Sequence, residues 1–330
     1  AKESYEKSVK AEDTAMQELL NEMAQYDTDN SGSGGGTTRP AGGITATVEG
    51  KTVTITKDNV ADYLGRVVSN YKPTTNTVTI GSTTYTVSNN YRLYYIDFEK
   101  KYNKDEVSVF LKADCTGNRY ALGQDTTVST ADNVKIKALN PSLYKDGVTS
   151  PTASNANMKA VTWLLNTSNW NSLKTGASLA DKVNYVVGAP SVEMMMDSYN
   201  TKYGLTNGKM ITDTLTASTD RVKLFYQYPT TINSNNYGYE VGPSNSSSAK
   251  NGYYYRTSNY TVKTDSKVDS MYYPGDNQYY WLASPSAGGT SNVLRVDCSG
   301  GGNVISYGYN IGYAFCPLVS LNSTVSLQLQ

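Results

Sequence analysis

Side chains able to do acid–base or nucleophilic chemistry are few in this chain, and their spacing forms none of the usual catalytic patterns. Histidine is absent from the 330 residues, which excludes a His-based triad and a His-ligated metal site. The sequence contains no Gly-x-Ser-x-Gly elbow, no phosphate-binding loop and no dinucleotide fingerprint, and nothing in it brings two carboxylates together. We therefore expect a protein that is not an enzyme and that uses no cofactor and no metal.

The chain has three cysteines, Cys115, Cys298 and Cys316, and no Cys-x-x-Cys pair. Zinc and redox motifs therefore have little support. One disulfide and one spare thiol is the simplest arrangement outside the cytosol.

The composition indicates an extracellular, β-rich surface protein. There are 29 basic and 29 acidic residues, so no basic excess points to nucleic acid. Tyrosine occurs 29 times, against 4 Phe and 3 Trp, and tyrosine serves both packing and contact. No apolar run approaches the ~18 residues of a membrane span, and no secretory signal is present, so we expect a mature or trimmed form.

The stretch from Ser286 to Cys316 has an unusual composition. It lacks Lys, Glu, Gln, Met and Trp, and is rich in Gly, Ser, Asn and Tyr. Apolar residues such as Val293 and Val296 recur among residues that look freely chosen. Binding loops on a rigid scaffold favour this composition.

The pattern of the chain predicts an α+β protein. Four segments are expected: a helix over 1–26, a Gly/Ser-rich linker over 27–43, a small hairpin and helix segment over 44–89, and a larger domain over 90–330. Helix 1–26 has two interpretations, a surface helix docked on the domain or the exposed end of a longer anchoring helix. The elements expected beyond it are hairpins 44–48/52–56 and 77–80/84–87, strands 91–98, 107–113, 185–187, 292–299, 304–313 and 318–321, and helices 58–68, 157–165 and 192–203.

Three motifs near the end of the chain resemble the variable proteins of diversity-generating retroelements. They are Tyr280-Trp-Leu-Ala-Ser-Pro-Ser286, Val293-x-x-Val296 and Pro317-Leu-Val-Ser-Leu321. The resemblance covers residues 90–321 in the order of elements and is specific only from Trp281 onward. It implies a C-type-lectin-like (formylglycine-generating-enzyme-like) head with two helices and small antiparallel sheets, in which Trp281 is structural.

In that family, adenines of a template repeat are randomised, often at AAC codons. Changing the first two bases of AAC cannot produce Lys, Glu, Gln, Met or Trp, the residues missing from 286–316. The resemblance therefore implies a set of diversified, ligand-facing positions: Gly288, Gly289, Ser291, Asn292, Arg295, Asp297, Ser299, Asn303, Ile305, Ser306, Gly308 and Asn310.

The resemblance also bears on metals and cysteines. The Glu-Pro-Asn and Trp-Asn-Asp motifs of calcium-dependent lectins are absent, so sugar binding through calcium is not expected. We hypothesise a structural disulfide between Cys115 and Cys316, with Cys298 as a thiol. An oxidase of the formylglycine-generating type would instead bind copper at Cys298 and Cys316, which a copper titration of the reduced protein tests.

The charged helix 1–26 resembles the exposed part of the first helix of type IV pilin-like proteins. This implies display at the cell surface, anchored in a membrane or pilus through a preceding segment. We expect a Tyr-rich protein that binds a protein or other macromolecular surface ligand through 288–310, supported by loops such as Tyr253–Tyr260. Pilus subunits are expected partners of the helix, and nucleic acid is not. The alternative is a non-diversified pilin-like subunit or fixed adhesin, with a role in adhesion, on the same scaffold.

Overall fold

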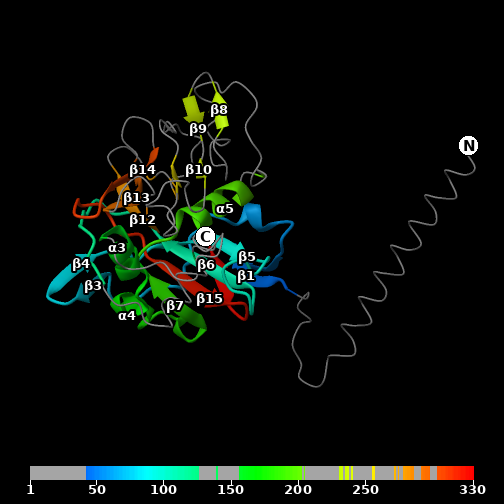
Figure 1. Ribbon diagram of the computed structural model, residues 1–330. Helices are drawn as coiled ribbons and strands as arrows, with labels where there is room; N and C mark the ends of the chain where they lie inside the picture. Colours follow the sequence, from blue (N-terminus) through cyan, green and yellow to red (C-terminus); the bar gives the residue numbers. More distant parts are fainter. Residues whose placement is uncertain are drawn as a thin grey trace, which may run out of the picture. The chain divides into compact units, whose positions relative to one another are not determined.

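The computed structural model describes residues 42–125, 139, 156–202, 204, 271, 272, 274, 278–285, 291–297 and 303–330, and the backbone of four short strands between 230 and 256 (Figure 1). The side chains of 297 and 303–306 lie outside this description. The chain divides into two compact units, Ala1–Gly43 and Ile44–Gln330. The expected helix 1–26, almost all of the expected linker 27–43, and the loop Tyr253–Tyr260 apart from the backbone of 255 and 256 lie outside the described residues.

The described residues form mixed helices and small, mostly antiparallel sheets, as expected for an α+β protein. The strands are β1 (Ile44–Val48), β2 (Lys51–Ile55), β3 (Thr77–Ile80), β4 (Thr83–Thr86), β5 (Tyr91–Asp97), β6 (Ser108–Ala113), β7 (Val183–Val187), β8 (Thr230–Ile232), β9 (Asn235–Tyr237), β10 (Tyr239–Glu240), β11 (Tyr255–Arg256), β12 (Tyr279–Pro285), β13 (Asn292–Asp297), β14 (Asn303–Gly308), β15 (Leu318–Asn322) and β16 (Ser326–Leu329). The helices are α3 (Ala156–Leu165), α4 (Thr167–Trp170) and α5 (Val192–Lys202), with short 3₁₀ turns η1 (Val60–Asp62), η3 (Asn171–Lys174) and η4 (Ala180–Lys182).

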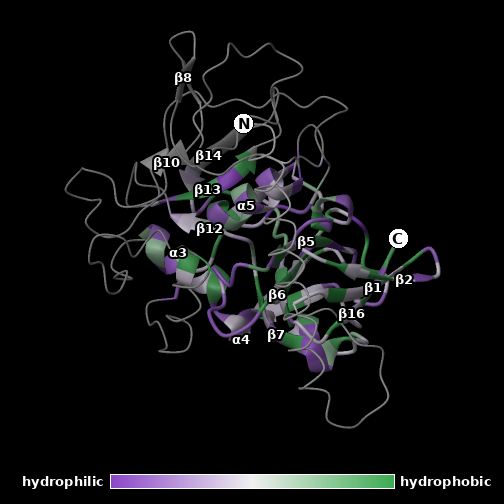
Figure 2. Cartoon of the chain, turned by 90° about the vertical axis from the view of Figure 1, so that its right-hand side faces the viewer, coloured by the Kyte–Doolittle hydropathy of each residue, from purple (hydrophilic) through white to green (hydrophobic). Residues whose placement is uncertain are grey.

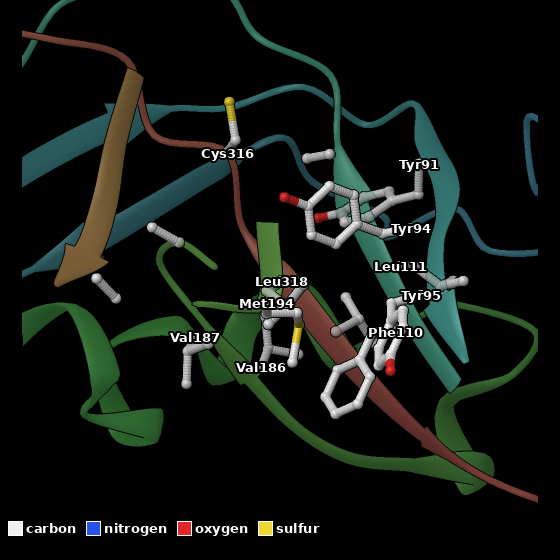
Figure 3. Packing of buried hydrophobic residues seen from close by; sticks show 14 of the residues in the cluster. Tyr91, Tyr94, Tyr95, Phe110, Leu111, Val186, Val187, Met194, Cys316 and Leu318 are labelled. Carbon is white, nitrogen blue, oxygen red and sulfur yellow. The ribbon is translucent and has the colours of Figure 1, made fainter. Parts of the chain in front are cut away.

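A four-stranded antiparallel sheet in the order β5-β6-β15-β7 runs through the core. Strand β6 is buried along its whole length, and four of the five residues of β15 are buried as well. Because both faces of these strands are covered, apolar residues occupy consecutive positions in their sequences and do not alternate strictly with polar ones. Figure 2 shows hydrophobic residues along β6 and β7, and Figure 3 shows Phe110, Val186 and Leu318 meeting Met194 of α5.

A second sheet, in the order β16-β1-β2, joins distant parts of the unit. Strand β1 pairs antiparallel with β2 and parallel with β16, so Thr45 lies opposite Ser326. Residues 44–89, which the sequence suggested as a segment of their own, therefore share one compact unit and one hydrophobic core with the rest of 44–330.

The helix expected over 58–68 is much shorter in the structure. Only the 3₁₀ turn η1 forms, and the chain then leaves helical geometry at Gly65, whose φ is +93°. The Gly65 N–H donates to the carbonyl of Leu93, and Val68 forms a bridge with Leu329. Sheet-like pairing outweighs the local helical pattern here, which is the usual way that tertiary context overrides propensity.

Helix α5 begins and ends where the sequence indicates. The Ser191 hydroxyl accepts from the Met194 N–H at 3.2 Å, and Gly204 follows the helix with a φ of +64°. The three methionines Met194, Met195 and Met196 are buried in the core, where their unbranched side chains can fill irregular spaces. Among the described residues, every helix is too short or too polar to cross a bilayer.

Candidate ligand-binding site

The region singled out by the sequence folds into a three-stranded antiparallel sheet, β12-β13-β14. The β13–β14 pairing runs without interruption from Asn292 opposite Gly308 to Asp297 opposite Asn303. Between these ends, Arg295 lies opposite Ile305. Six of the expected ligand-facing residues are thus direct cross-strand partners on one hairpin. The pair Asn292–Gly308 lies on the opposite face of the sheet from the pairs Arg295–Ile305 and Asp297–Asn303.

Strand β12 anchors this sheet to the core through Trp281. The indole is fully buried, and its Nε1 donates to the carbonyl of Tyr120 at 3.0 Å. The Trp281 N–H also donates to the carbonyl of Ala314, and the Ala283 N–H to that of Pro190. A buried indole with its N–H satisfied contributes a large apolar area at no polar cost. The structural role expected for Trp281 agrees with this environment.

The segment that follows β14 is held on both sides. The Tyr309 N–H donates to the carbonyl of Ser291 at 3.0 Å, and the Leu122 N–H donates to the carbonyl of Tyr309 at 2.8 Å. Tyr313 and Tyr120 exchange two backbone hydrogen bonds. The residues from 309 to 313 therefore have a fixed backbone although they reach the surface.

The twelve expected ligand-facing positions have different environments in the structure. Ser291 and Asn310 are exposed, Asn292 and Gly308 are half-buried, and Arg295 is buried. Asp297, Asn303, Ile305 and Ser306 are placed by their backbone alone, in β13 and β14. Gly288, Gly289 and Ser299 lie outside the described residues, as does Cys298.

Arg295 differs from the expectation of a ligand-facing side chain, because only 6% of it is exposed. Its guanidinium carbon lies 4.0 Å from the ring centre of Tyr313, 4.6 Å from that of Tyr307 and 5.2 Å from that of Tyr279. All three distances are within the range in which a cation is attracted to an aromatic face. We call the rings of Tyr279, Tyr307 and Tyr313 the tyrosine cage.

The largest exposed apolar side chains of the described residues lie on this same sheet edge. They are Tyr307, which is 44% exposed, and Ile311, which is 40% exposed. Exposed Ser291 and Asn310 lie in the two segments that meet at the Tyr309–Ser291 hydrogen bond. Rigid aromatic area beside small polar groups is the usual chemistry of a binding surface.

Cys115 and Cys316 lie together but keep their thiols, so the structure does not contain the hypothesised disulfide. Burial by itself raises the pKa of the Cys316 thiol, but a hydrogen bond from Cys115 and the charge of Lys112 outweigh this and lower the pKa below its ordinary value. A deprotonated thiol is the form that attacks a disulfide. Their closeness is compatible with the bond, which remains a prediction.

Sequence reasoning expected a strand over 304–313, which contains Tyr307 and Tyr313, but missed the cage. Tyr279 precedes Arg295 in the sequence, and the two become neighbours only through the β12–β13 register, in which Trp281 lies opposite Arg295. Diagonal neighbours across a sheet are within reach of long side chains. The sequence signal for the cage was the pattern Tyr279-x-Trp281 on one strand facing Arg295-x-Asp297 on the next. This signal predicts the contact only when the register between the two strands is known.

Comparison of the chain with protein-family models, with curated proteins and with solved structures finds no match.

Proposed function

We propose that this chain is a surface-displayed ligand-binding protein with a C-type-lectin-like head, whose C-terminal variable region is diversified by a retroelement. In this proposal, a pilin-like helix and a flexible linker precede the head. The partner is a protein or other macromolecule on a surface, contacted through the β13–β14 hairpin and the turn after it.

The observation that carries this proposal is the exposure of Tyr307 and Ile311. Both belong to a segment whose backbone is fixed by hydrogen bonds to Ser291 and Leu122. Among the described residues, Tyr307 and Ile311 are the only large hydrophobic side chains that are exposed, and the same part of the chain carries exposed Ser291 and Asn310. Because the backbone is already ordered, binding through this edge would cost little conformational entropy.

The separation of framework and surface residues supports the diversification part. Val293, Leu294, Val296 and Trp281 are fully buried, while four of the expected ligand-facing positions, Ser291, Asn292, Gly308 and Asn310, are exposed or half-buried. Changing exposed residues on a buried framework alters contacts without altering the fold. The missing residue types between 286 and 316 fit randomised AAC codons.

The direct test is deep resequencing of codons 286–316 in a population that carries this gene. Substitutions confined to former adenine positions, beside unchanged Trp281 and Pro317 codons, are the expected result. A single invariant sequence would overturn diversification and leave a fixed adhesin or a pilin-like structural subunit. Filament assembly would then be the property to measure.

A second test separates binding from stability. We expect a combined Ser291→Tyr, Asn292→Asp and Asn310→Arg variant to change which surface ligands are captured, with the free energy of unfolding within about 1 kcal/mol of the original. The matched control is the same three substitutions placed at Lys51, Thr83 and Thr84, which are exposed on β2 and β4. Unfolding of the first variant would show that its positions are structural.

A further inference from the structure

We propose that the tyrosine cage is a cation-binding site whose internal occupant is Arg295, and that it accepts the guanidinium or ammonium group of a partner protein when residue 295 is small. The cage itself is independent of the proposed function. Its use for an external ligand rests on that function, because it requires residue 295 to vary.

The geometry of the three rings is that of a box around a positive charge. The ring of Tyr307 stands at 90° to that of Tyr313 with centres 6.0 Å apart, and the ring of Tyr279 is tilted by 44° with its centre 5.7 Å from Tyr313. The guanidinium carbon of Arg295 lies within 5.2 Å of all three centres. Several electron-rich faces directed at one cation is the arrangement that recognises alkylated ammonium groups.

Contacts outside the cage hold its walls in place. The ring of Trp281 packs edge-on against Tyr313 with centres 4.8 Å apart, and the backbone of Tyr313 is paired with Tyr120. The guanidinium of Arg119 lies 4.5 Å from the ring centre of Tyr279. Two of the three walls therefore keep neighbours of their own if the side chain at 295 is shortened.

The third wall gives access from solvent. Tyr307 is 44% exposed, whereas Tyr313 is 5% exposed, so Tyr307 forms the rim and Tyr313 the floor. A side chain that cannot reach the floor leaves a space with the size and electrostatics of a guanidinium group. An external cation entering this space loses water but regains three aromatic faces, which makes it a defined anchor for a partner.

Residue 295 controls the occupancy of the cage. Arginine and serine are both reachable at an AAC-derived codon, so diversification would produce chains whose cage is filled from within and chains whose cage is open. Chains with arginine at position 295 present a closed tyrosine surface. Chains with a small residue there present a surface that selects cations. Specificity would then change in kind, and not only in strength, with one substitution.

The test uses the full chain with Arg295→Ser and tetramethylammonium as the probe. We expect a saturable saturation-transfer signal from the protein to the probe's methyl protons in the millimolar range, displaced by guanidinium but not by sodium at the same ionic strength. The original chain should give no such signal, because Arg295 occupies the cage. Comparing the dissociation constant of guanidinium, obtained from its displacement of the probe, with that of tetramethylammonium shows which of these two groups the cage prefers.

Arg66→Ser is the matched control, because the guanidinium of Arg66 lies over a single described ring, that of Tyr63, at 5.9 Å. It should give no saturable signal. Adding Tyr307→Ala to Arg295→Ser should weaken probe binding about tenfold. Absence of saturable binding to a folded Arg295→Ser protein, or equal binding by the double variant, would overturn the cage.

A second measurement applies if Arg295→Ser does not fold. Tyr307→Ala removes the rim in the original chain, so the rate of Arg295 modification by phenylglyoxal should rise in a peptide map. Tyr309→Ala is the control and should leave that rate unchanged. Equal rates in the two variants would show that Tyr307 does not enclose Arg295. Resequencing codon 295 tests the diversification separately. If Arg295→Ser binds the probe but codon 295 does not vary in the population, the cage itself stands, and the proposal that it binds a partner's cation in natural chains is refuted.

Discussion

At the scale of single residues, Trp281 links the candidate binding sheet to the core. It contacts Tyr313 edge-on, donates to the carbonyl of Tyr120 and lies opposite Arg295 in the β12–β13 register. The same residue therefore positions the floor of the tyrosine cage and supports the hairpin that carries the exposed positions. Its role in the proposed binding would be indirect, through the placement of other side chains.

We predict that Trp281→Ala destabilises the fold by ~3–5 kcal/mol, because truncating a fully buried large aromatic leaves a cavity. Urea unfolding followed by far-UV circular dichroism measures this. Asn310→Ala, an exposed change on the same sheet edge, should stay within about 0.5 kcal/mol. Similar losses in the two variants would mean that Trp281 is not an anchor.

Lys101 is the second residue with a measurable role. Its Nζ lies 2.7 Å from Asp197 Oδ2 and 3.1 Å from Glu193 Oε1, two carboxylates that are almost fully buried on α5. Burial alone would lower the pKa of Lys101, but the attraction of Asp197 and Glu193 is larger and raises the pKa above the ordinary 10.5. The neighbouring Tyr102 hydroxyl also donates to Asp197, at 2.6 Å.

The raised pKa gives a pH prediction with a definite sign. Because the folded state holds the Lys101 proton more tightly than the unfolded state, the ion pairs stabilise the fold fully at any pH below 10.5 at which Asp197 and Glu193 are ionised, and this contribution disappears as pH rises through the folded-state pKa of Lys101. Lys101→Met should therefore cost about 2–3 kcal/mol at pH 8, and the difference from the original chain should shrink above pH 10.5.

Urea unfolding at a series of pH values measures the Lys101 effect. Lys57→Met is the control, since Lys57 pairs with Glu99 on the exposed surface and should show no measurable change. A Lys101 difference that stays constant with pH would show that packing of its side chain, and not its charge, is what stabilises the fold.

At the scale of elements, the β1–β2 turn is short and strained. Glu49 and Gly50 connect the strands, and both have positive φ, +50° and +77°. A two-residue hairpin turn of type I′ has this conformation at both positions, and Gly and Asn adopt it readily whereas Glu does not.

We predict that Glu49→Asn stabilises the fold by ~0.5–1 kcal/mol, since Asn tolerates the left-handed conformation. The midpoint of urea unfolding measures the change. Lys51→Asn, in the exposed start of β2, introduces the same residue without the turn conformation and should be neutral or slightly destabilising. A gain from both substitutions would point to a charge effect instead of turn geometry.

Elements with a strong local pattern were predictable from the sequence, and those set by distant contacts were not. The hairpins 44–55 and 77–86, strand β6 and helix α5 form within a residue or two of their expected bounds. The expected helix 58–68 failed because Gly65 and Val68 pair with strands that are remote in the sequence. The burial of Arg295 was missed for the same reason, because it depends on the register between β12, β13 and β14.

At the scale of the whole molecule, 44–330 is one compact unit with a continuous hydrophobic core. Leu327 of β16 is fully buried where that strand pairs with β1, and Trp281 lies in the same core on a different sheet. Damage at one sheet should therefore affect the stability of the other.

We predict that Leu327→Ala costs ~2–5 kcal/mol and shifts unfolding of the whole unit as one transition. Tryptophan fluorescence and far-UV circular dichroism should report the same midpoint in urea, although the three tryptophans 163, 170 and 281 lie in α3, α4 and β12, outside the β16-β1-β2 sheet. Gln328→Ala, on the exposed side of the same strand, is the control. Two separate transitions would show that the β16-β1-β2 sheet is an independent unit.

The pairing of β1 with β16 also has a consequence for the order of events during synthesis. The Ser69 hydroxyl donates to the carbonyl of Gln328, 259 positions away, and β1 forms even more distant pairs with the same strand. During synthesis, strand β1 leaves the ribosome long before β16, so the edge of β1 that pairs with β16 stays uncovered until β16 appears. Closing such long loops is slow, and an uncovered edge invites pairing with another chain. Folding of this unit should therefore be sensitive to protection of β1 until β16 has been made, so factors that delay premature pairing should raise its yield more than factors that accelerate local structure.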